Sequence, residues 1–394
     1  MKILPPFFTL RFFLLCSSSF LFFASFNMII PELPAYLSSL GGEDYKGLII
    51  SLFTLTAGLS RPFSGKLADK IGRIPVMFFG AGVCFVISLL YPIISSVAGF
   101  LCLRFFHGFS TGFTPTGISA YVADLVPINR RGEAMGLQSL FSSLGMAAGP
   151  AMGGFIAELH GTTPLFYTSS GVAVLTMLLL MRLKETHSEP ESLKFDHLRL
   201  KKNEILETRV IAPSLVLFFS VLSFGIILTI IPDFSTHLGI QNKGLFFAVF
   251  TLSSLIIRII AGKASDKFGR VPVLKAATLC LAISMTGIAL AETSLALIIS
   301  AVVFGCAVGM TSPTVAAWTI DLSIDGFRGR ALATMYISLE AGIGLGALFS
   351  GWVYANDANN FPLVFLMGTS GALVAFVGLF LKRRIVPSKN STIK

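Results

Sequence analysis

Apolar runs of about 20 residues follow one another along the whole chain, separated by short polar connections. A helical run of that length crosses a hydrocarbon core roughly 30 Å thick. The runs show no alternation of apolar and polar positions, so helices rather than barrel strands are expected to span the bilayer. The pattern predicts an all-α integral membrane protein with twelve transmembrane helices, at residues 11–31, 46–64, 75–94, 98–122, 134–157, 164–182, 212–232, 244–262, 273–291, 294–317, 332–354 and 362–381.

A charged turn between two apolar runs occurs twice, with an offset of 197 residues. Residues 61–73 read RPFSGKLADKIGR, and residues 258–270 read RIIAGKASDKFGR. A repeat of nearly half the chain length indicates two homologous halves. Both halves begin on the same side of the membrane, so the pseudo-twofold axis is expected along the membrane normal.

The repeat divides the chain into two six-helix bundles of similar length. We expect the first bundle at residues 1–184 and the second at residues 211–394. The segment 185–210 between them is the one long hydrophilic stretch, and we expect a cytoplasmic linker whose charges are solvated. The predicted fold is therefore two pseudo-symmetric six-helix bundles.

Composition agrees with a membrane protein, and the net charge of +10 reflects its topology. Charged residues make up 13% of the chain, against about 25% in soluble proteins. Among Lys and Arg, Lys46 and Lys243 alone fall in loops on one side, while the termini and most connections on the other side are basic. This bias predicts cytoplasmic termini in a plasma membrane, or in the inner membrane of a Gram-negative bacterium. Because the charge sorts by side, we expect no nucleic-acid partner.

The charged turns contain glycines and aspartates at fixed positions. The paired positions are Gly65, Asp69, Gly72 and Arg73 in the first copy and Gly262, Asp266, Gly269 and Arg270 in the second. The same offset relates Asp124 to Asp321 and Arg131 to Arg328. The glycines allow close approach and sharp turns, and each arginine can reach the aspartate of its half. We favour a gating role over topology alone, because topology requires charge but no aspartate at a fixed spacing.

The first charged turn resembles the signature loop of the major facilitator superfamily, and the second resembles the partial duplicate that this family has between spans eight and nine. Arg104-x-x-x-Gly108 resembles a motif of proton-coupled members. The resemblance implies a central cavity and alternating access, and it favours the twelve-helix drug:proton antiporter branch. It also implies that Asp69 lies near the start of the eleventh helix.

A glycine and proline run in the fifth span resembles the motif of proton-driven exporters. It contains Gly145, Gly149, Pro150, Gly153 and Gly154. Glycines at every fourth position permit close helix contact, and the proline removes one backbone hydrogen bond. The alternative is ordinary packing through small residues.

Arg104 and His107 lie three positions apart inside the fourth span, and so share one helix face. An ionisable residue at membrane depth is a candidate functional residue. The family commonly has Gln at the position of His107, so this chain departs from the family pattern there. His107 is therefore a candidate either for proton coupling or for a contact with substrate. A satisfied hydrogen bond between helices is the alternative for His107.

Three further charges lie within the spans. Arg258 is expected to extend towards lipid headgroups. Glu340 aligns with Ser143 in the repeat, and it either pairs with Arg61 or is itself a protonatable site. Polar or aromatic residues in four other places are candidates for the cavity, although each also fits packing: Asn27, Gln138, Trp318 and Tyr336.

These features predict a secondary active transporter that exports a small amphipathic molecule by alternating access, with a proton gradient as its energy source. Candidate proton carriers, besides Arg104 and His107, are Glu32, Asp233 and Glu340. A nutrient importer is the alternative, and a membrane receptor or enzyme is a remote one. No nucleotide-binding loop, nucleophile motif or metal cluster is present in the sequence, so we expect neither catalysis, cofactor nor metal. The expected partners are substrate and lipid, with a monomeric chain.

Overall fold

The computed structural model describes residues 9–126, 131–187, 190–192, 206–323 and 328–381. Within these ranges the chain is helical, and twelve helices have 18 or more residues. Nine of the helices in the described ranges are apolar enough to cross a membrane, or ten with the bent helix α9. The long helices are α1 (Leu10–Ile29), α3 (Lys46–Ile71), α4 (Arg73–Leu90), α5 (Val97–Leu125), α6 (Arg131–His160), α7 (Thr162–Met181), α8 (Ile211–His237), α9 (Leu245–Phe268), α10 (Arg270–Ala289), α11 (Ser294–Leu322), α12 (Arg328–Tyr354) and α13 (Phe361–Leu381).

Short-range signals in the sequence account for several helix ends. The Thr9, Ser96 and Thr293 side chains accept a hydrogen bond from the first turn of α1, α5 and α11. Gly72 and Gly269 have φ values of 111° and 91°, in the region that favours glycine. These two glycines let α4 and α10 begin directly after α3 and α9 end.

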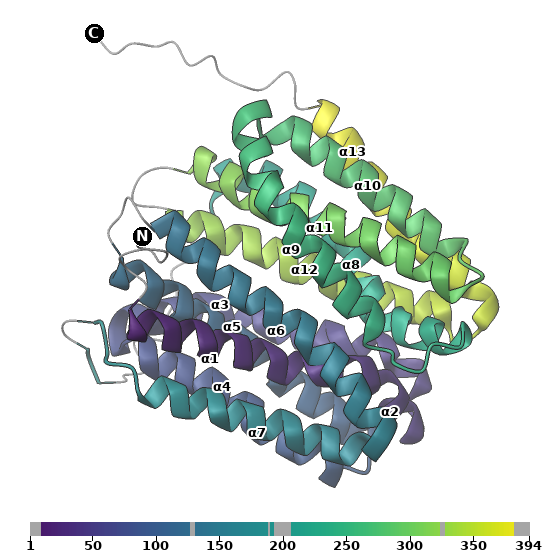
Figure 1. Ribbon diagram of the computed structural model, residues 1–394, viewed down its shortest axis with the longest axis horizontal. Helices are drawn as coiled ribbons and strands as arrows, with labels where there is room; N and C mark the ends of the chain where they lie inside the picture. Colours follow the sequence, from purple (N-terminus) through teal and green to yellow (C-terminus); the bar gives the residue numbers. More distant parts are fainter. Residues whose placement is uncertain (1–8, 127–130, 188–189, 193–205, 324–327, 382–394) are drawn as a thin grey trace, which may run out of the picture.

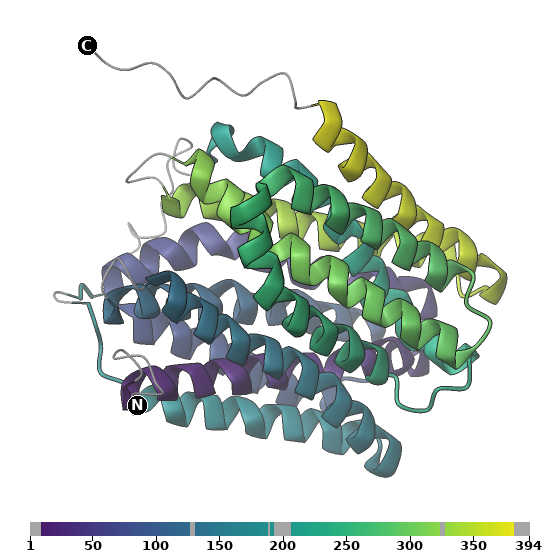
Figure 2. The ribbon, with the colours of Figure 1, turned by 45° about the horizontal axis from the view of Figure 1, so that its top comes forward.

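The helices form two groups that follow the order of the sequence. α1 and α3–α7 lie together in the lower part of Figure 1, and α8–α13 lie together above them; the turned view in Figure 2 shows the same division. The packing repeats, because α1 packs on α6 as α8 packs on α12, and α3 packs on α5 as α9 packs on α11. The two groups meet where α3 contacts α12 and where α6 contacts α9.

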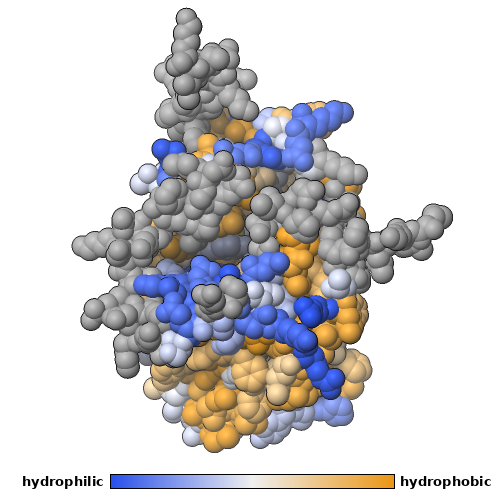
Figure 3. All heavy atoms as spheres, turned by 90° about the vertical axis from the view of Figure 1, so that its left-hand side faces the viewer, coloured by the Kyte–Doolittle hydropathy of each residue, from blue (hydrophilic) through white to orange (hydrophobic). Residues whose placement is uncertain are grey.

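The two ends of the helix bundle differ in what they contain. The turns at Gly72 and Gly269 lie at one end, which we call the motif end, together with the start of α1 and the end of α13 (Figure 1). Segments 40–45 and 238–244 lie at the other end, which we call the distal end. Hydrophilic side chains form a band across the face at the motif end, and apolar side chains border this band below and to the right (Figure 3). This arrangement suits helices that cross a bilayer.

Candidate functional site

At the distal end, two ion pairs join the two helix groups. Lys243 Nζ lies 2.8 Å from Glu32 Oε2, and Lys46 Nζ lies 2.5 Å from Asp233 Oδ2. The carboxylates and ammonium groups are mostly buried, with side-chain exposures between 8% and 21%. Each pair takes its acid from one helix group and its lysine from the other.

The repeat relates these two ion pairs to each other. Lys46 and Lys243 are 197 positions apart, and Glu32 and Asp233 are 201 positions apart. The sequence therefore contains two features that point to this contact. Lys46 and Lys243 are the lysines in the loops on one side of the membrane, and Glu32 and Asp233 align in the two halves. Sequence reasoning treated the acids as separate candidates and missed their lysine partners.

Halfway along the helices, Arg61 of α3 contacts Glu340 of α12. Arg61 Nη2 lies 2.6 Å from Glu340 Oε1, and Arg61 Nε donates to the same oxygen at 3.2 Å. The guanidinium carbon also lies 4.8 Å from the centre of the Tyr336 ring. Of the two sequence-based alternatives for Glu340, the structure contains the pair with Arg61.

The repeat-related arginine, Arg258 of α9, also contacts the opposite helix group. Its Nη1 donates to Ser143 Oγ at 3.2 Å and to Ser139 Oγ at 3.3 Å, both on α6. The expectation that Arg258 extends to lipid headgroups is therefore wrong, because α9 and α6 come close enough for a contact between the groups. Ser143 occupies the position that corresponds to Glu340.

At the motif end, each arginine of the charged turns contacts two aspartates. Arg73 reaches Asp69 at 2.9 Å and Asp124 at 3.1 Å. Arg270 makes the same contacts, with Asp266 at 2.5 Å and Asp321 at 2.9 Å. The Asp69 and Asp266 side chains are each 73% exposed.

Other residues of the charged turns have different surroundings. Gly65 and Gly262 lie inside helices, and a Cβ there would meet nothing within 4 Å, so neither serves a close approach. The side chains of Arg131 and Arg328 lie outside the described residues. The expected contact between Asp69 and the start of the eleventh helix, which corresponds to α12, involves side chains outside that part as well.

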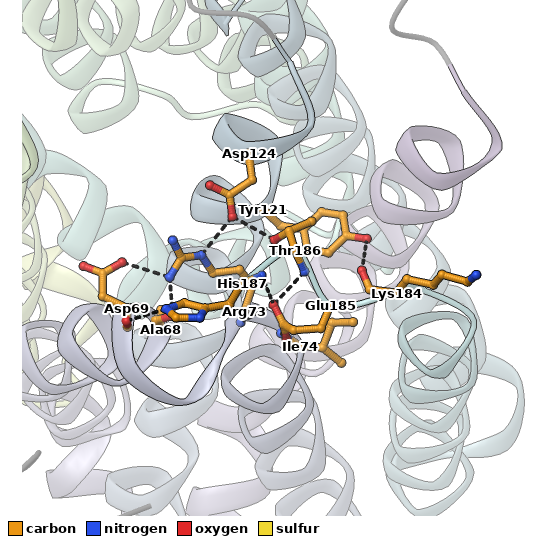
Figure 4. Close-up of polar contacts among 10 residues, drawn as sticks. All are labelled: Ala68, Asp69, Arg73, Ile74, Tyr121, Asp124, Lys184, Glu185, Thr186 and His187. Atoms are coloured by element: carbon orange, nitrogen blue, oxygen red, sulfur yellow. Dashed lines mark hydrogen bonds and ion pairs between the residues drawn. The ribbon is translucent and has the colours of Figure 1, made fainter. Parts of the chain in front are cut away.

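The start of the linker binds the charged turn of the first half (Figure 4). Glu185 accepts from the backbone N–H groups of Arg73 and Ile74, at 3.0 and 2.9 Å. Thr186 Oγ1 donates to Asp124 at 2.7 Å, and His187 Nε2 contacts the carbonyl oxygen of Asp69 at 2.8 Å. The expectation of solvated linker charges did not include this contact.

The surroundings of Glu185 alter its acidity. Burial by itself would raise the pKa of Glu185, but backbone N–H groups from His187, Arg73, Ile74 and Thr186 together lower that pKa below its ordinary value. The charged form of the Glu185 carboxylate therefore stabilises the start of α4.

Arg104 and His107 lie inside the first helix group. Arg104 Nε donates to Ile49 O at 2.9 Å, and Nη1 lies 3.3 Å from the Tyr91 hydroxyl, which in turn lies 3.2 Å from His107 Nδ1. The Phe53 ring covers the guanidinium at 4.6 Å. Both side chains are almost completely buried, and Arg104 Nη2 and His107 Nε2 have no hydrogen-bond partner within the described chain.

The glycine run of α6 faces α1. A Cβ added to Gly145, Gly149 or Gly153 would lie against backbone atoms of α1, and the carbonyl oxygen of Pro150 lies against Gly244 of the second group. Gly154 packs against Asn242. The run thus permits both the α1 contact and the approach of α9.

The remaining candidates are buried or lie to one side. Asn27 donates to Phe23 O of its own helix, and Gln138 donates to Ser19 and Ser142. Trp318 packs in the core of the second group and lines a groove of about 530 Å³ between α8, α11 and α13.

Comparison with known proteins gives one family. The sequence model described as "Major Facilitator Superfamily" matches residues 15–214 and again residues 213–394. The chain is 27% identical over 389 residues to "Multidrug resistance protein MdtG" of Enterobacter lignolyticus, covering 92% of this chain and 90% of that protein. It is 29% identical over 296 residues to "Multidrug resistance protein 2" of Bacillus subtilis, covering 72% of each.

Solved structures with the same fold include two transporters. The "D-xylose-proton symporter" has a TM-score of 0.77 at 16% identity, covering 96% of this chain and 98% of that chain. The "human organic anion transporter MFSD10 (TETRAN)" has a TM-score of 0.73 at 21% identity, covering 95% and 100%. At these identities the likeness establishes the arrangement of helices.

Proposed function

Because this chain belongs to the major facilitator superfamily of membrane transporters, and is therefore a transporter rather than an enzyme, we propose that it exports small amphipathic molecules in exchange for protons. Relatives called multidrug resistance proteins align over as much as 93% of the chain and support export. The Lys and Arg bias supports cytoplasmic termini and a motif end facing the cytoplasm, in a plasma membrane or a bacterial inner membrane.

The contact between Arg61 and Glu340 is the observation that carries this proposal. It joins the two helix groups halfway along α3 and α12, at 2.6 Å, with both side chains mostly buried. Alternating access requires the contacts between the groups to change, and a ligand shifts such an equilibrium only by binding one state better. A proton on Glu340 removes the negative charge that holds Arg61, so protonation favours the state in which this contact is open.

The two distal ion pairs close one end of the interface between the helix groups. Glu32 with Lys243 and Asp233 with Lys46 hold the groups together at the distal end, which faces outside in the proposed orientation. These pairs must separate for substrate to leave on that side. Arg104 and His107 are second candidates for the proton path, since ionisable residues at membrane depth often form proton relays.

Transport into inverted membrane vesicles tests the proposal. An imposed pH gradient, acidic inside, is monitored with a pH-sensitive dye while rhodamine 123, fluorescein, antibiotics and sugars are added in turn. We expect at least one amphipathic compound to accumulate inside while protons leave. Glu340→Gln is expected to abolish the proton movement, whereas Glu292→Gln, an exposed acid in a loop, keeps it.

Three results would count against proton-coupled export. Accumulation unaffected by a protonophore would exclude the proton gradient as the energy source. Movement of substrate and protons in the same direction would favour an importer. Coupling that survives in Glu340→Gln would exclude Glu340 as the proton carrier.

A further inference from the structure

The two arginines halfway along the interface occupy equivalent positions but have different partners. Arg61 contacts Glu340, whereas Arg258 contacts Ser139 and Ser143. Ser143 and Glu340 are themselves related by the 197-residue offset. The second half therefore supplies a carboxylate to the arginine of the first half. The first half supplies only hydroxyl groups to Arg258 of the second half.

Within the part of the chain that the structure describes, Arg258 is consequently a cation at membrane depth without a counter-charge. Among the residues that the structure describes, no carboxylate lies within ion-pair distance of Arg258. Its Nε is buried and has no hydrogen-bond partner in the described chain. A buried charge is costly unless it is paired, so an arginine with two neutral acceptors and a free donor is suited to bind an anion.

The position of Arg258 lies on the contact between the two helix groups. Arg258 is about halfway along α9, where two straight segments, Leu245–Arg258 and Ile260–Phe268, meet at 43°. Tyr336 lies under the Arg61 guanidinium, so an aromatic ring is close to one of the two arginines. The side chains at this depth of the interface thus include a cation, two hydroxyl groups and an aromatic ring.

We propose that Arg258, with Ser139 and Ser143, binds the anionic group of the transported molecule, and that the substrates are amphipathic organic anions such as aromatic carboxylates or sulfonates. This inference rests on the proposed export function and specifies its substrate class. The guanidinium forms charge-assisted hydrogen bonds to the anion, and the hydroxyl groups donate to it. The substrate anion thus takes the place that Glu340 occupies beside Arg61.

Position 143 offers a test in which only charge varies. Ser143→Glu recreates the acid found at position 340 and is expected to pair with Arg258, whereas Ser143→Gln has nearly the same size and no charge. Binding of fluorescein, an anionic xanthene dye, and rhodamine 123, a cationic one, is measured on the purified protein in detergent by fluorescence polarisation. No proton gradient enters this measurement.

We expect wild-type protein to bind fluorescein more tightly than rhodamine 123. Ser143→Glu is expected to weaken fluorescein binding roughly 10- to 100-fold, as for the loss of a hydrogen bond to a charged group. Ser143→Gln loses the hydroxyl group but adds no charge, so it is expected to weaken fluorescein binding only about 2- to 10-fold, less than Ser143→Glu does, and neither variant should weaken rhodamine 123 binding. Arg258→Gln should remove the preference for fluorescein. If the Arg258→Gln protein does not fold, the two Ser143 variants still test the inference.

Two results overturn the inference: tighter wild-type binding of rhodamine 123, or equal fluorescein binding by Ser143→Glu and Ser143→Gln. Failure of the export proposal has a different signature. In that case the fluorescein preference and its loss in Ser143→Glu persist, while vesicles show no proton-dependent accumulation of either dye.

Discussion

The contact between α3 and α12 and the contact between α6 and α9 are related by the repeat but differ in their electrostatics. In the first, Arg61 is neutralised by Glu340; in the second, Arg258 reaches Ser143 at the equivalent position. At the distal end, by contrast, both repeat-related ion pairs are kept. The duplicated scaffold thus closes the distal end symmetrically, while one acid, present in a single half, differentiates the two sides of the interface.

The largest expected effect comes from removing that acid. Glu340→Gln leaves Arg61 buried without a counter-charge, and we expect the free energy of unfolding to fall by about 3–5 kcal/mol. Ser143→Ala, at the equivalent position, removes a neutral acceptor and is expected to cost about 1 kcal/mol. Chemical denaturation in detergent, followed by tryptophan fluorescence and circular dichroism, measures both.

The double variant Arg61→Gln with Glu340→Gln serves as the control. Without the unpaired charge, it should regain most of the stability that Glu340→Gln loses. Equal costs for Glu340→Gln and Ser143→Ala would mean that the two contacts do not differ electrostatically in the way the structure indicates.

The glycine contacts should respond alike in the two halves. A Cβ on Gly145 would collide with the carbonyl oxygen of Phe20 in α1, and a Cβ on Gly342 would lie 2.5 Å from that of Phe218 in α8. Each glycine-to-alanine change is expected to lower unfolding free energy by about 1–3 kcal/mol, because the helices must move apart. The measurement is thermal unfolding of each purified variant.

Gly136→Ala is the matched control on α6, since its Cβ would meet nothing within 4 Å, and it should have no destabilising effect. A large cost at position 145 with none at position 342 would contradict equivalent packing of α1 on α6 and of α8 on α12.

The distal ion pairs should contribute equally and more modestly. Lys46→Gln and Lys243→Gln each leave a mostly buried carboxylate without its ionic partner, for an expected loss of about 1–3 kcal/mol. Spin labels at positions 39 and 241, in a cysteine-free background, report separation of the groups at this end. We expect the double lysine variant to populate longer distances than either single variant.

Two further variants serve as controls for this prediction. Glu43→Gln changes an exposed acid at the same end and should leave the distance distribution unaltered. Exchanging the charges in the wild type, with Glu32→Lys and Lys243→Glu, should keep the short distance. If the double lysine variant keeps the wild-type distribution, the ion pairs do not hold this end together.

Sequence patterns predicted the features that depend on periodicity and duplication. Apolar runs gave the helices, and the repeat gave the contacts of Arg73 with Asp124 and of Arg270 with Asp321, which the structure contains. The reach of Arg258 to Ser143 was not predictable in this way, because it depends on how closely α9 approaches α6. Sequence alone places Arg258 in a span without saying which side of the helix faces the other group.

The linker contact escaped prediction for another reason. Glu185 belongs to a segment that is not repeated, and at offset 197 the chain has Lys382. Neither hydrophobic periodicity nor symmetry therefore marks Glu185, although its carboxylate caps the first turn of α4.

The smallest expected effect contrasts the two charged turns. Glu185→Gln weakens the cap on α4 and is expected to lower the free energy of unfolding by about 1 kcal/mol at neutral pH. In the described part of the chain, no side chain bonds the first backbone N–H groups of α10 in the same way. Because folding lowers the pKa of Glu185, its contribution is complete above the unfolded pKa of about 4.3 and disappears as pH falls through the folded value. The wild type and Glu185→Gln should therefore converge in stability at acidic pH, measured by unfolding between pH 3 and pH 7. A gap that stays constant across that range would mean that the charge of Glu185 does not stabilise the turn, and that the two halves do not differ at this end.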